Sequence, residues 1–307
     1  MADERLTPSS GKTLVMSSEA IIQVIASGLL MGLIYALIAV GLSLIFGLMD
    51  VVNFAHGEFL MVAMYAAFGL WLFTGIDPVL LAPVVTALLF VLGALAYLGI
   101  VRYAMRAKAN VGMVQIFATF GLAILMQGLA QYFFTPDYRT IGASWLGGRT
   151  VNLAGIFLPM PQIYGGLVSI AVFGGLYLLM SRTDFGRALE ATREDGGAVA
   201  LVGIDRNRVF ALGWGLGAAL VGLAGAVLAI FYYVHPQVGG TFALIAYVTV
   251  ALGGFGSVFG ALAAGVIVGL VEALTAIILP SSLKSVGVYA LYLGVVFIRP
   301  SGLFGRL

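Results

Sequence analysis

Apolar runs long enough to cross a bilayer recur along this chain, and they decide which folds are open to it. The runs cover approximately residues 20–46, 54–73, 79–101, 111–134, 164–181, 209–233, 241–279 and 285–299. About 20 apolar residues span the membrane core as a helix. A transmembrane β-barrel would instead show short segments of alternating polarity. The sequence therefore predicts an all-α, polytopic membrane protein with about eight spans.

Glycine is unusually frequent inside these runs, with 42 residues in a chain of 307. Many glycines and alanines stand four residues apart, a spacing that lets helix backbones approach closely. The clearest cases are Gly213/Gly217, Ala218/Gly222/Ala226, Gly256/Gly260/Ala264 and Ala261/Gly265/Gly269. We therefore expect the spans to pack tightly against one another, forming one membrane domain over residues 19–307 after a polar tail at 1–18.

The basic residues indicate an orientation, because short loops rich in Lys and Arg stay in the cytoplasm. Ten of the 15 basic residues fall in three places. These are the loop after residue 101, the stretch 182–208 and the C-terminus. The segment 135–163 has few basic residues and three prolines, so we expect it to be a large extracytoplasmic loop. The side on which the N-terminus lies stays open.

Two irregular segments stand out, one inside an apolar run and one between two runs. The run 241–279 contains a Gly-rich sequence around Gly254, which predicts a short segment followed by a full span. An even number of crossings must separate Arg208 from Arg299, and such a break supplies the missing one. A helix broken at mid-membrane depth would mark a transport path. A simple turn between packed helices is the equally weighted alternative.

The second interruption follows the first span and places four polar residues among apolar ones. They are Asp50, Asn53, His56 and Glu58. Ionised carboxylates are costly inside a membrane unless they face water, a partner or a substrate. We expect this segment, together with Glu272 of a later span, to line a translocation path. The alternatives are a solvated surface turn for the first group and a structural contact for Glu272.

Signals for enzyme chemistry are weak. Gly11-Lys12-Thr13 resembles the end of a phosphate-binding loop, but Leu6 stands where the first glycine should be, so no ATP site is predicted. His56 and Glu58 lack a third ligand for a metal. A net charge of +2 does not suggest a nucleic-acid partner. We expect neither catalysis nor a cofactor.

The stretch 182–208 holds ten of the chain's 28 charged residues and must lie in water. Thr183 or Asp184 can cap a helix that starts near Phe185. A second short helix over 198–202 would end at Gly203. Such a helix pair would present apolar residues to a groove on a soluble protein, namely Leu189, Val199, Leu201 and Val202. An amphipathic loop lying on the lipid surface is the alternative.

These residues also carry a family resemblance. The run Ser181-x-x-Asp-Phe-Gly-Arg-Ala-Leu-Glu-Ala-Thr, followed by Ala198-Val-Ala-Leu-Val-Gly-Ile204, resembles the coupling loop of LivH-type permeases, from ABC importers of branched-chain amino acids. The segments from Gly32 to Gly47 and Val52 to Phe59, and the run Leu252 to Ala261, are similar to further signatures of that family. The resemblance extends from about residue 20 to Gly305.

The resemblance implies a permease in the bacterial inner membrane that works with three kinds of partner. These are a second homologous permease, two cytoplasmic ABC ATPases and an extracytoplasmic solute-binding protein. The importer-wide Glu-Ala-Ala-x-x-x-Gly pattern maps onto Glu190, Ala191, Thr192 and Gly196, without its usual Ile-x-Leu-Pro ending. The ATPase-coupling residues would be Arg187, Leu189, Glu190, Ala191, Gly196, Leu201 and Gly203.

Branched-chain amino acids are the expected cargo, and urea or short amides are carried by other members of the family. Two rival classes remain at the level of sequence. An ion-coupled secondary transporter would also need broken helices and buried carboxylates, but it has no need of a cytoplasmic helix pair. A membrane scaffold would tolerate substitution of Glu190 or Leu201 without loss of transport.

Overall fold

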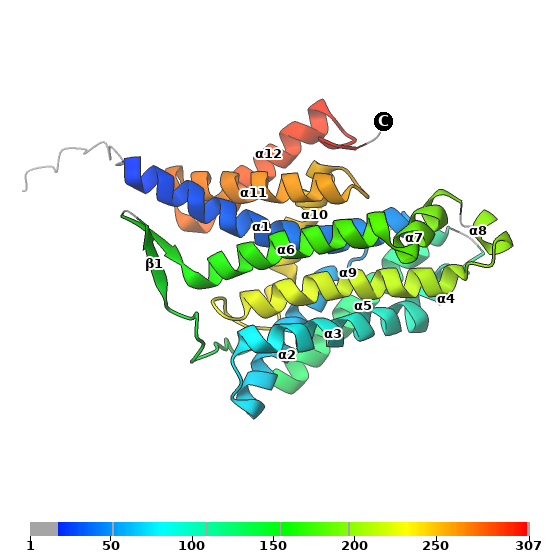
Figure 1. Cartoon of the computed structure of the whole chain (residues 1–307), viewed down its shortest axis with the longest axis horizontal. Helices are drawn as coiled ribbons and strands as arrows, with labels where there is room; N and C mark the ends of the chain where they lie inside the picture. Colours follow the sequence, from blue (N-terminus) through cyan, green and yellow to red (C-terminus); the bar gives the residue numbers. More distant parts are fainter. Residues whose placement is uncertain (1–17, 51, 109, 154, 196, 306–307) are drawn as a thin grey trace, which may run out of the picture.

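A computed structural model describes residues 18–50, 52–108, 110–153, 155–195 and 197–305 as a bundle of long helices (Figure 1). Within these described residues, seven helical segments are long and apolar enough to cross a membrane. They are α1 (Ser18–Met49), α2 (His56–Thr74), α3 (Pro78–Ala96) with its continuation, α5 (Val111–Phe134), α6 (Met160–Arg182), α9 (Arg206–Leu228) and α11 (Val258–Ile278). The continuation of α3 is a π-helical turn, η1 (Tyr97–Val101), and α4 (Arg102–Ala104).

The remaining elements are shorter. The apolar helices α10 (Val238–Gly253) and α12 (Lys284–Ile298) belong to the bundle. Outside it lie α7 (Asp184–Glu194), α8 (Ala198–Leu201), a 3-10 turn η2 (Ser281–Leu283) and two strands, β1 (Thr150–Leu153) and β2 (Ile156–Pro159). The strands pair antiparallel, with Thr150 opposite Pro159. The polytopic all-α class predicted above is confirmed.

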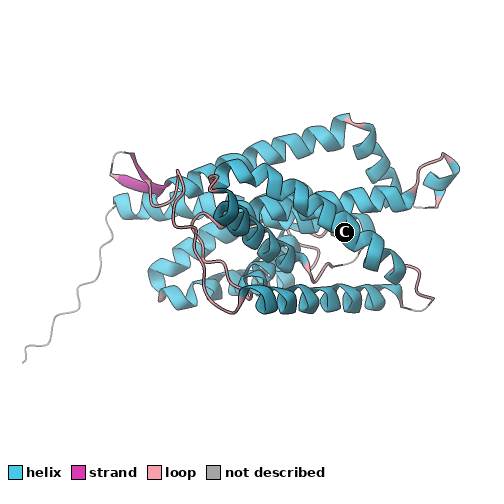
Figure 2. Ribbon diagram, turned by 90° about the horizontal axis from the view of Figure 1, so that it is seen from below, coloured by secondary structure: helices cyan, strands magenta, loops and turns pink. Residues whose placement is uncertain are grey.

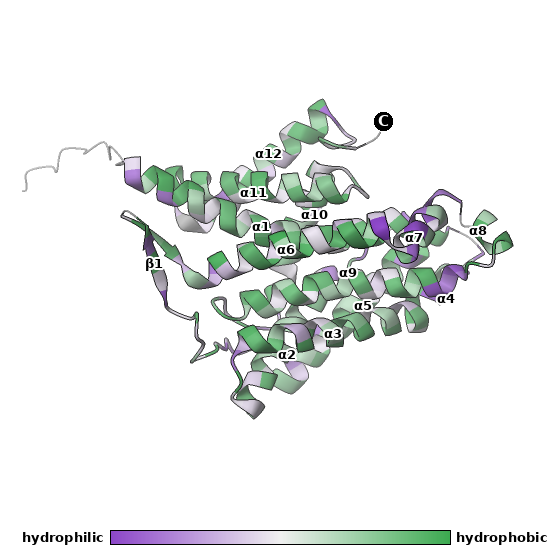
Figure 3. Ribbon diagram, in the orientation of Figure 1, coloured by the Kyte–Doolittle hydropathy of each residue, from purple (hydrophilic) through white to green (hydrophobic). Residues whose placement is uncertain are grey.

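The two ends of the bundle differ in polarity. Hydrophilic residues gather around α4 and α7 at one end (Figure 3), which we call the α7 end. The β1–β2 hairpin lies at the opposite end, beside the start of α1 (Figure 2), and we call this the hairpin end. There Gly155 approaches the carboxylate of Glu19. The start of α1 therefore lies at the hairpin end, a point that the sequence had left open.

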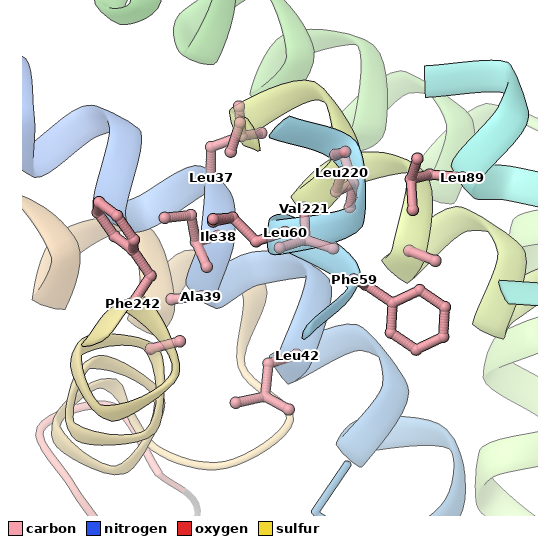
Figure 4. Packing of buried hydrophobic residues seen from close by; sticks show 14 of the residues in the cluster. Leu37, Ile38, Ala39, Leu42, Phe59, Leu60, Leu89, Leu220, Val221 and Phe242 are labelled. Carbon is pink, nitrogen blue, oxygen red and sulfur yellow. The ribbon is translucent and has the colours of Figure 1, made fainter. Parts of the chain in front are cut away.

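Helices α1 and α9 form the centre of the bundle, and α3, α5 and α6 lie at its periphery. In Figure 4, Ile38 of α1 lies near Leu60 of α2, with Val221 of α9 behind them and Phe242 of α10 to one side. Each of these four side chains is almost fully buried. The surrounding helices thus pack around one apolar core that runs along α1.

Small residues bring α1 and α11 into direct backbone contact, as predicted from their spacing. A Cβ added to Gly265 would lie 2.5 Å from Ala36 Cα, and one added to Gly32 would lie 2.8 Å from Gly265 O. On the opposite side of α1, a Cβ on Gly41 would lie 2.6 Å from Gly217 O of α9. Any larger side chain at these positions must push the helices apart.

The run 241–279 divides into α10 and α11, so the short segment and full span expected there are present. Helices α9 to α12 then give four membrane passes between Arg208 and Arg299. Four is an even number of crossings, as expected if both arginines lie on the same side of the membrane. The break at Gly254 lies at the α7 end, since a Cβ on the neighbouring Gly256 would lie 3.1 Å from both Arg193 Nη2 and Gly47 Cα. The alternative of a turn between packed helices holds here, and the mid-membrane break predicted at Gly254 is wrong.

The C-terminal segment closes this turn. The N–H of Leu303 donates to Leu252 O at 2.7 Å, and the N–H of Phe304 donates to Gly253 O at 3.3 Å. The last carbonyls of a helix have no partner within the helix. Residues 302–305 therefore cap α10 from a distant part of the sequence. Gly254 and Gly302 both have positive φ, +96° and +80°, and no side chain fits between the two segments.

Candidate functional site

The segment between α1 and α2 folds back into the bundle. Helix α1 ends at Met49, and Ile38 precedes that end by eleven residues. His56 Nε2 nevertheless lies 2.9 Å from Ile38 O. At about 1.5 Å per residue, the contact lies about 16 Å from the end of α1. Helix α2 therefore begins well inside the bundle, at a depth where backbone polar groups need partners from the protein.

The protein supplies partners for this irregular backbone. The N–H of Phe54 donates to Thr119 Oγ1 of α5 at 3.3 Å, and the N–H of Ala55 donates to Asn53 Oδ1 at 3.0 Å. The hydroxyl of Tyr247 on α10 donates to the carbonyls of Asn53 and Phe54 at 3.1 and 3.2 Å. Three helices thus hold the re-entrant segment in place.

Helix α10 also begins inside the bundle. A Cβ on Gly57 would collide with Gly239 O, so the first turns of α2 and α10 touch. The ring centroids of Tyr35 and Phe242 are 6.4 Å apart, which places the start of α10 beside the middle of α1. Sequence reasoning missed this second internal helix start, because it attributed the irregularity to Gly254 at the other end of α10.

Buried polar side chains occur at the start of α2 and on helices α1 and α5. Asn53, His56 and Glu58 are at most 8% exposed, and so are Ser43 on α1 and Gln115 on α5. Five buried atoms have no hydrogen-bond partner among the described residues: Ser43 Oγ, Asn53 Nδ2, His56 Nδ1, Glu58 Oε2 and Gln115 Oε1. Buried polar atoms are rarely left unpaired, since each costs about 1–3 kcal/mol. The arrangement suits a hydrated or ligand-binding interior.

Asp50 does not belong to this group. It follows the last residue of α1, its side chain is exposed, and its φ is +53°. Its N–H still donates to Phe46 O at 2.8 Å, so it terminates α1. The four polar residues that the sequence grouped together are therefore divided: Asn53, His56 and Glu58 are buried, whereas Asp50 lies at the surface of the α7 end.

Glu272 occupies a different part of the bundle, near the hairpin end. It is 7% exposed, and its Oε1 lies 2.8 Å from Nζ of Lys284 at the start of α12. The two residues line a cavity of about 390 Å³ with Tyr35, Tyr232 and Gln162. Sequence reasoning named Glu272 but not Lys284, because a lysine just before an apolar run is expected at the membrane interface.

At the α7 end, the charged stretch forms the two short helices that were predicted. Thr183 caps α7 by accepting from the N–H of Gly186 at 3.1 Å. Asp195 caps α8 by accepting from the N–H groups of Gly197 at 2.8 Å and Ala198 at 2.9 Å. The N–H groups of Ala198 and Gly197 hold the pKa of the Asp195 carboxyl below its usual value. Gly203 follows α8 with φ +83°, as its predicted role at the helix end requires.

The apolar residues of this pair point in two directions. Leu189 and Val199 are 3% and 4% exposed, and Leu189 Cδ1 would lie 3.9 Å from a Cβ on Gly213 of α9. Leu189 anchors α7 to the bundle, so its predicted insertion into a partner is wrong. Leu201 and Val202, in contrast, are 90% and 75% exposed.

The charged residues of α7 are exposed. Arg187 pairs with Asp184 of its own helix, at 2.9 Å, and such surface pairs add at most about 1 kcal/mol. Glu190 is exposed beside Arg193, and Ala191 is partly buried. Gly196, the last residue of the mapped pattern, lies outside the described residues.

Comparisons with known proteins place these features in context. Residues 24–298 match the family described as branched-chain amino acid transport system / permease component. The chain is 31% identical over 296 residues to the high-affinity branched-chain amino acid transport system permease protein BraD of Pseudomonas aeruginosa, with 93% of this chain and 96% of the relative covered. It is 30% identical over 298 residues to the permease LivH of Escherichia coli, with the same coverage.

A relative from an archaeon and one solved structure extend the comparison. The probable branched-chain amino acid transport permease protein LivH of Methanocaldococcus jannaschii is 29% identical over 248 residues, covering 80% of this chain and 78% of the relative. Among solved structures, PsaBC from Streptococcus pneumoniae in complex with Fab matches with a TM-score of 0.48 and 13% identity, over 94% of each chain.

Proposed function

We propose that this chain, which belongs to the family of permease components of branched-chain amino acid transport systems, carries branched-chain amino acids through the bacterial inner membrane as part of an ABC importer. Orientation follows from charge. Arg102, the arginines of 182–208 and Arg299 lie at the α7 end, so this end faces the cytoplasm. The hairpin end then faces outward.

One observation carries the proposal: a compact helix pair at the polar end of a membrane bundle exposes two large apolar side chains. Leu201 and Val202 extend from the end of α8, while Leu189 fixes α7 to α9 and α8 packs against α7. Exposed apolar residues on a water-facing element suit a groove on a soluble protein. An ATPase that binds Leu201 and Val202 could push α7 and α8 as a unit against the bundle.

A chain of contacts connects the helix pair α7 and α8 to the interior of the bundle. Arg193 of α7 lies against Gly256 in the α10–α11 turn, next to Gly47 of α1. Helix α10 leads from that turn to Gly239, where it touches Gly57 beside Glu58 and His56. Movement of α7 would therefore reach the buried polar group through one rigid helix. We assign Asn53, His56, Glu58 and Glu272 to the translocation path.

Partners follow from the same proposal. Two ATPase subunits would bind the α7 ends of this chain and of a second permease. A solute-binding protein would deliver cargo to the hairpin end, where residues 135–153 and 155–159 form the surface. There Arg139 pairs with Val234, and Asp77 accepts from the N–H of Trp145.

Uptake by the native host tests this function. Deletion of the gene should abolish ATP-dependent uptake of radiolabelled leucine, and the wild-type chain should restore it. Unlabelled isoleucine and valine should compete, whereas urea and acetamide should not. Uptake that survives ATP depletion but collapses with a proton or sodium gradient would contradict the proposal and favour a secondary transporter. Unchanged uptake after deletion would favour a scaffold.

A further inference from the structure

We infer that the cavity around Glu272 and Lys284 binds a zwitterionic amino acid before it enters the bundle. This inference rests on the function proposed above, and it adds a ligand site near the hairpin end. The cavity lies between α1, α6, α11, the start of α12 and the segment before α10. Its volume of about 390 Å³ falls within the range of 300–1,000 Å³ typical of small-molecule sites.

The charges of the cavity match those of the ligand. Among the residues that the structure describes, Glu272 and Lys284 are the charged residues lining it, and they lie 2.8 Å apart. The Glu272 side chain is 9% exposed and that of Lys284 is 44% exposed. A free amino acid carries one ammonium and one carboxylate on the same carbon. Its ammonium can bind Glu272 while its carboxylate binds Lys284, so one ion pair becomes two without any change in net charge.

An ion pair at this position calls for a reason beyond stability. Glu272 is buried, and an ionised carboxylate inside a membrane protein is costly. Its partner Lys284 is half-exposed, and an ion pair with an exposed member adds little stability. The contact between α11 and α12 does not depend on it, because Gly287 already packs directly against Thr275. The pair is better explained by exchange with a ligand of the same two charges.

The rest of the lining suits the remaining parts of such a ligand. Met31, Phe231 and the rings of Tyr35 and Tyr232 provide an apolar wall for a branched side chain. Gly28, Gly269 and Ala273 form a flat floor where α1 and α11 touch. Gln162 Oε1 is buried, has no hydrogen-bond partner among the described residues and can accept from an ammonium.

Because the chain has no cysteine, a single introduced thiol can report on the cavity. Ser27 lines it, and Ser181 lies exposed at the end of α6 on the opposite side of the bundle. We would express Ser27→Cys or Ser181→Cys in the native host and measure the rate of maleimide labelling in its membranes. Millimolar leucine should slow labelling of Ser27→Cys at least fivefold and leave Ser181→Cys unchanged.

The ligand's charges provide the specificity control. Lysine and glutamate would each leave an extra unpaired charge in the cavity, and urea has no charge for either residue, so none of the three should protect Ser27→Cys. In the Ser27→Cys background, Glu272→Gln and Lys284→Met should each abolish protection by leucine. The exchange of both charges, Glu272→Lys with Lys284→Glu, should restore part of it. Thermal unfolding of each variant in detergent identifies any that fail to fold.

Several outcomes would overturn the inference. Equal labelling with and without leucine is one, and protection that persists in a folded Glu272→Gln variant is another. Protection by urea as strong as that by leucine would also contradict a zwitterion site. These failures are separable from failure of the proposed function. A chain that restores leucine uptake but shows no protection at Ser27→Cys remains a permease that recognises its cargo elsewhere.

Discussion

The breaks before α2 and before α11 look similar in sequence and differ in depth. Each interrupts an apolar run with glycines: Gly47 and Gly57 flank the first, and Gly253 to Gly256 form the second. The first returns into the bundle as far as Ile38 and carries buried polar side chains. The second is a turn at the α7 end, closed by the C-terminal segment. Polar side chains, and not glycines, distinguish the break that enters the interior.

The largest expected effect comes from filling the contact between the two internal helix starts. Gly57→Val places a branched side chain against Gly239 O, where even a Cβ has no room. Overpacking of this kind costs about 1–3 kcal/mol or more, and here the obstacle is backbone. We expect a marked loss of folded protein, measured by thermal unfolding in detergent. Gly240→Ala is the matched control, because nothing lies within 4 Å of its Cβ position.

Equal stability of the two variants would mean that α2 and α10 do not begin in contact. The deep position assigned to the first break would then be wrong.

Removal of the bond that holds α2 at depth should have the next largest effect. His56→Leu leaves Ile38 O without the partner that His56 Nε2 provides at 2.9 Å. Ile38 O lies inside α1 and keeps its partner within the helix, so the loss is one buried hydrogen bond, about 0.5–1.5 kcal/mol. We expect a fall in unfolding temperature and in leucine uptake. His56→Gln retains a donor and should recover part of both losses. If Leu and Gln behave alike, the contact with Ile38 does not position the re-entrant segment.

Deletion of residues 302–307 tests whether the C-terminal segment stabilises the break before α11. It removes the donors to Leu252 O and Gly253 O, and hydrogen bonds of this kind contribute about 0.5–1.5 kcal/mol each. We expect a loss of stability comparable to that for His56→Leu. Hydrogen exchange should increase over the last turn of α10 and stay unchanged at the start of α2. Increased exchange at both ends of α10 would show that the two breaks are not independent.

The smallest effect on stability is expected at α8. Leu201 is 90% exposed, and surface substitutions usually change stability by less than about 0.5 kcal/mol. Leu201→Glu should therefore leave the unfolding temperature unchanged while reducing leucine uptake at least tenfold, because an ATPase groove would reject the charge. Arg187→Gln, at an exposed position on α7, serves as the control for altered surface charge. Normal uptake with Leu201→Glu would remove the coupling role from α8.

Much of this fold was predictable, because hydropathy and glycine spacing act locally. The spans, the small-residue face around Gly265 and the N-cap of α7 all follow from residues close in sequence, although the partner of that face, α1, does not. The depth at which the irregular segments lie in the bundle was harder to predict. Nothing near Gly254 reveals that residues 302–305 would close that turn, or that α10 would begin inside the bundle. Burial of Leu189 depends on Gly213, and the pairing of Glu272 with Lys284 depends on how α12 packs. Such features are set by distant parts of the chain.

The closure of α10 by the C-terminal segment has a consequence for biosynthesis. Leu252 is synthesised 51 residues before Leu303, whose N–H donates to the carbonyl of Leu252. At roughly 5–20 residues per second, its carbonyl stays without that partner for about 3–10 seconds after synthesis. Helix α10 therefore reaches its final state only after Leu303 has been added to the chain. Until then, the last turn of α10 stays open beside α7.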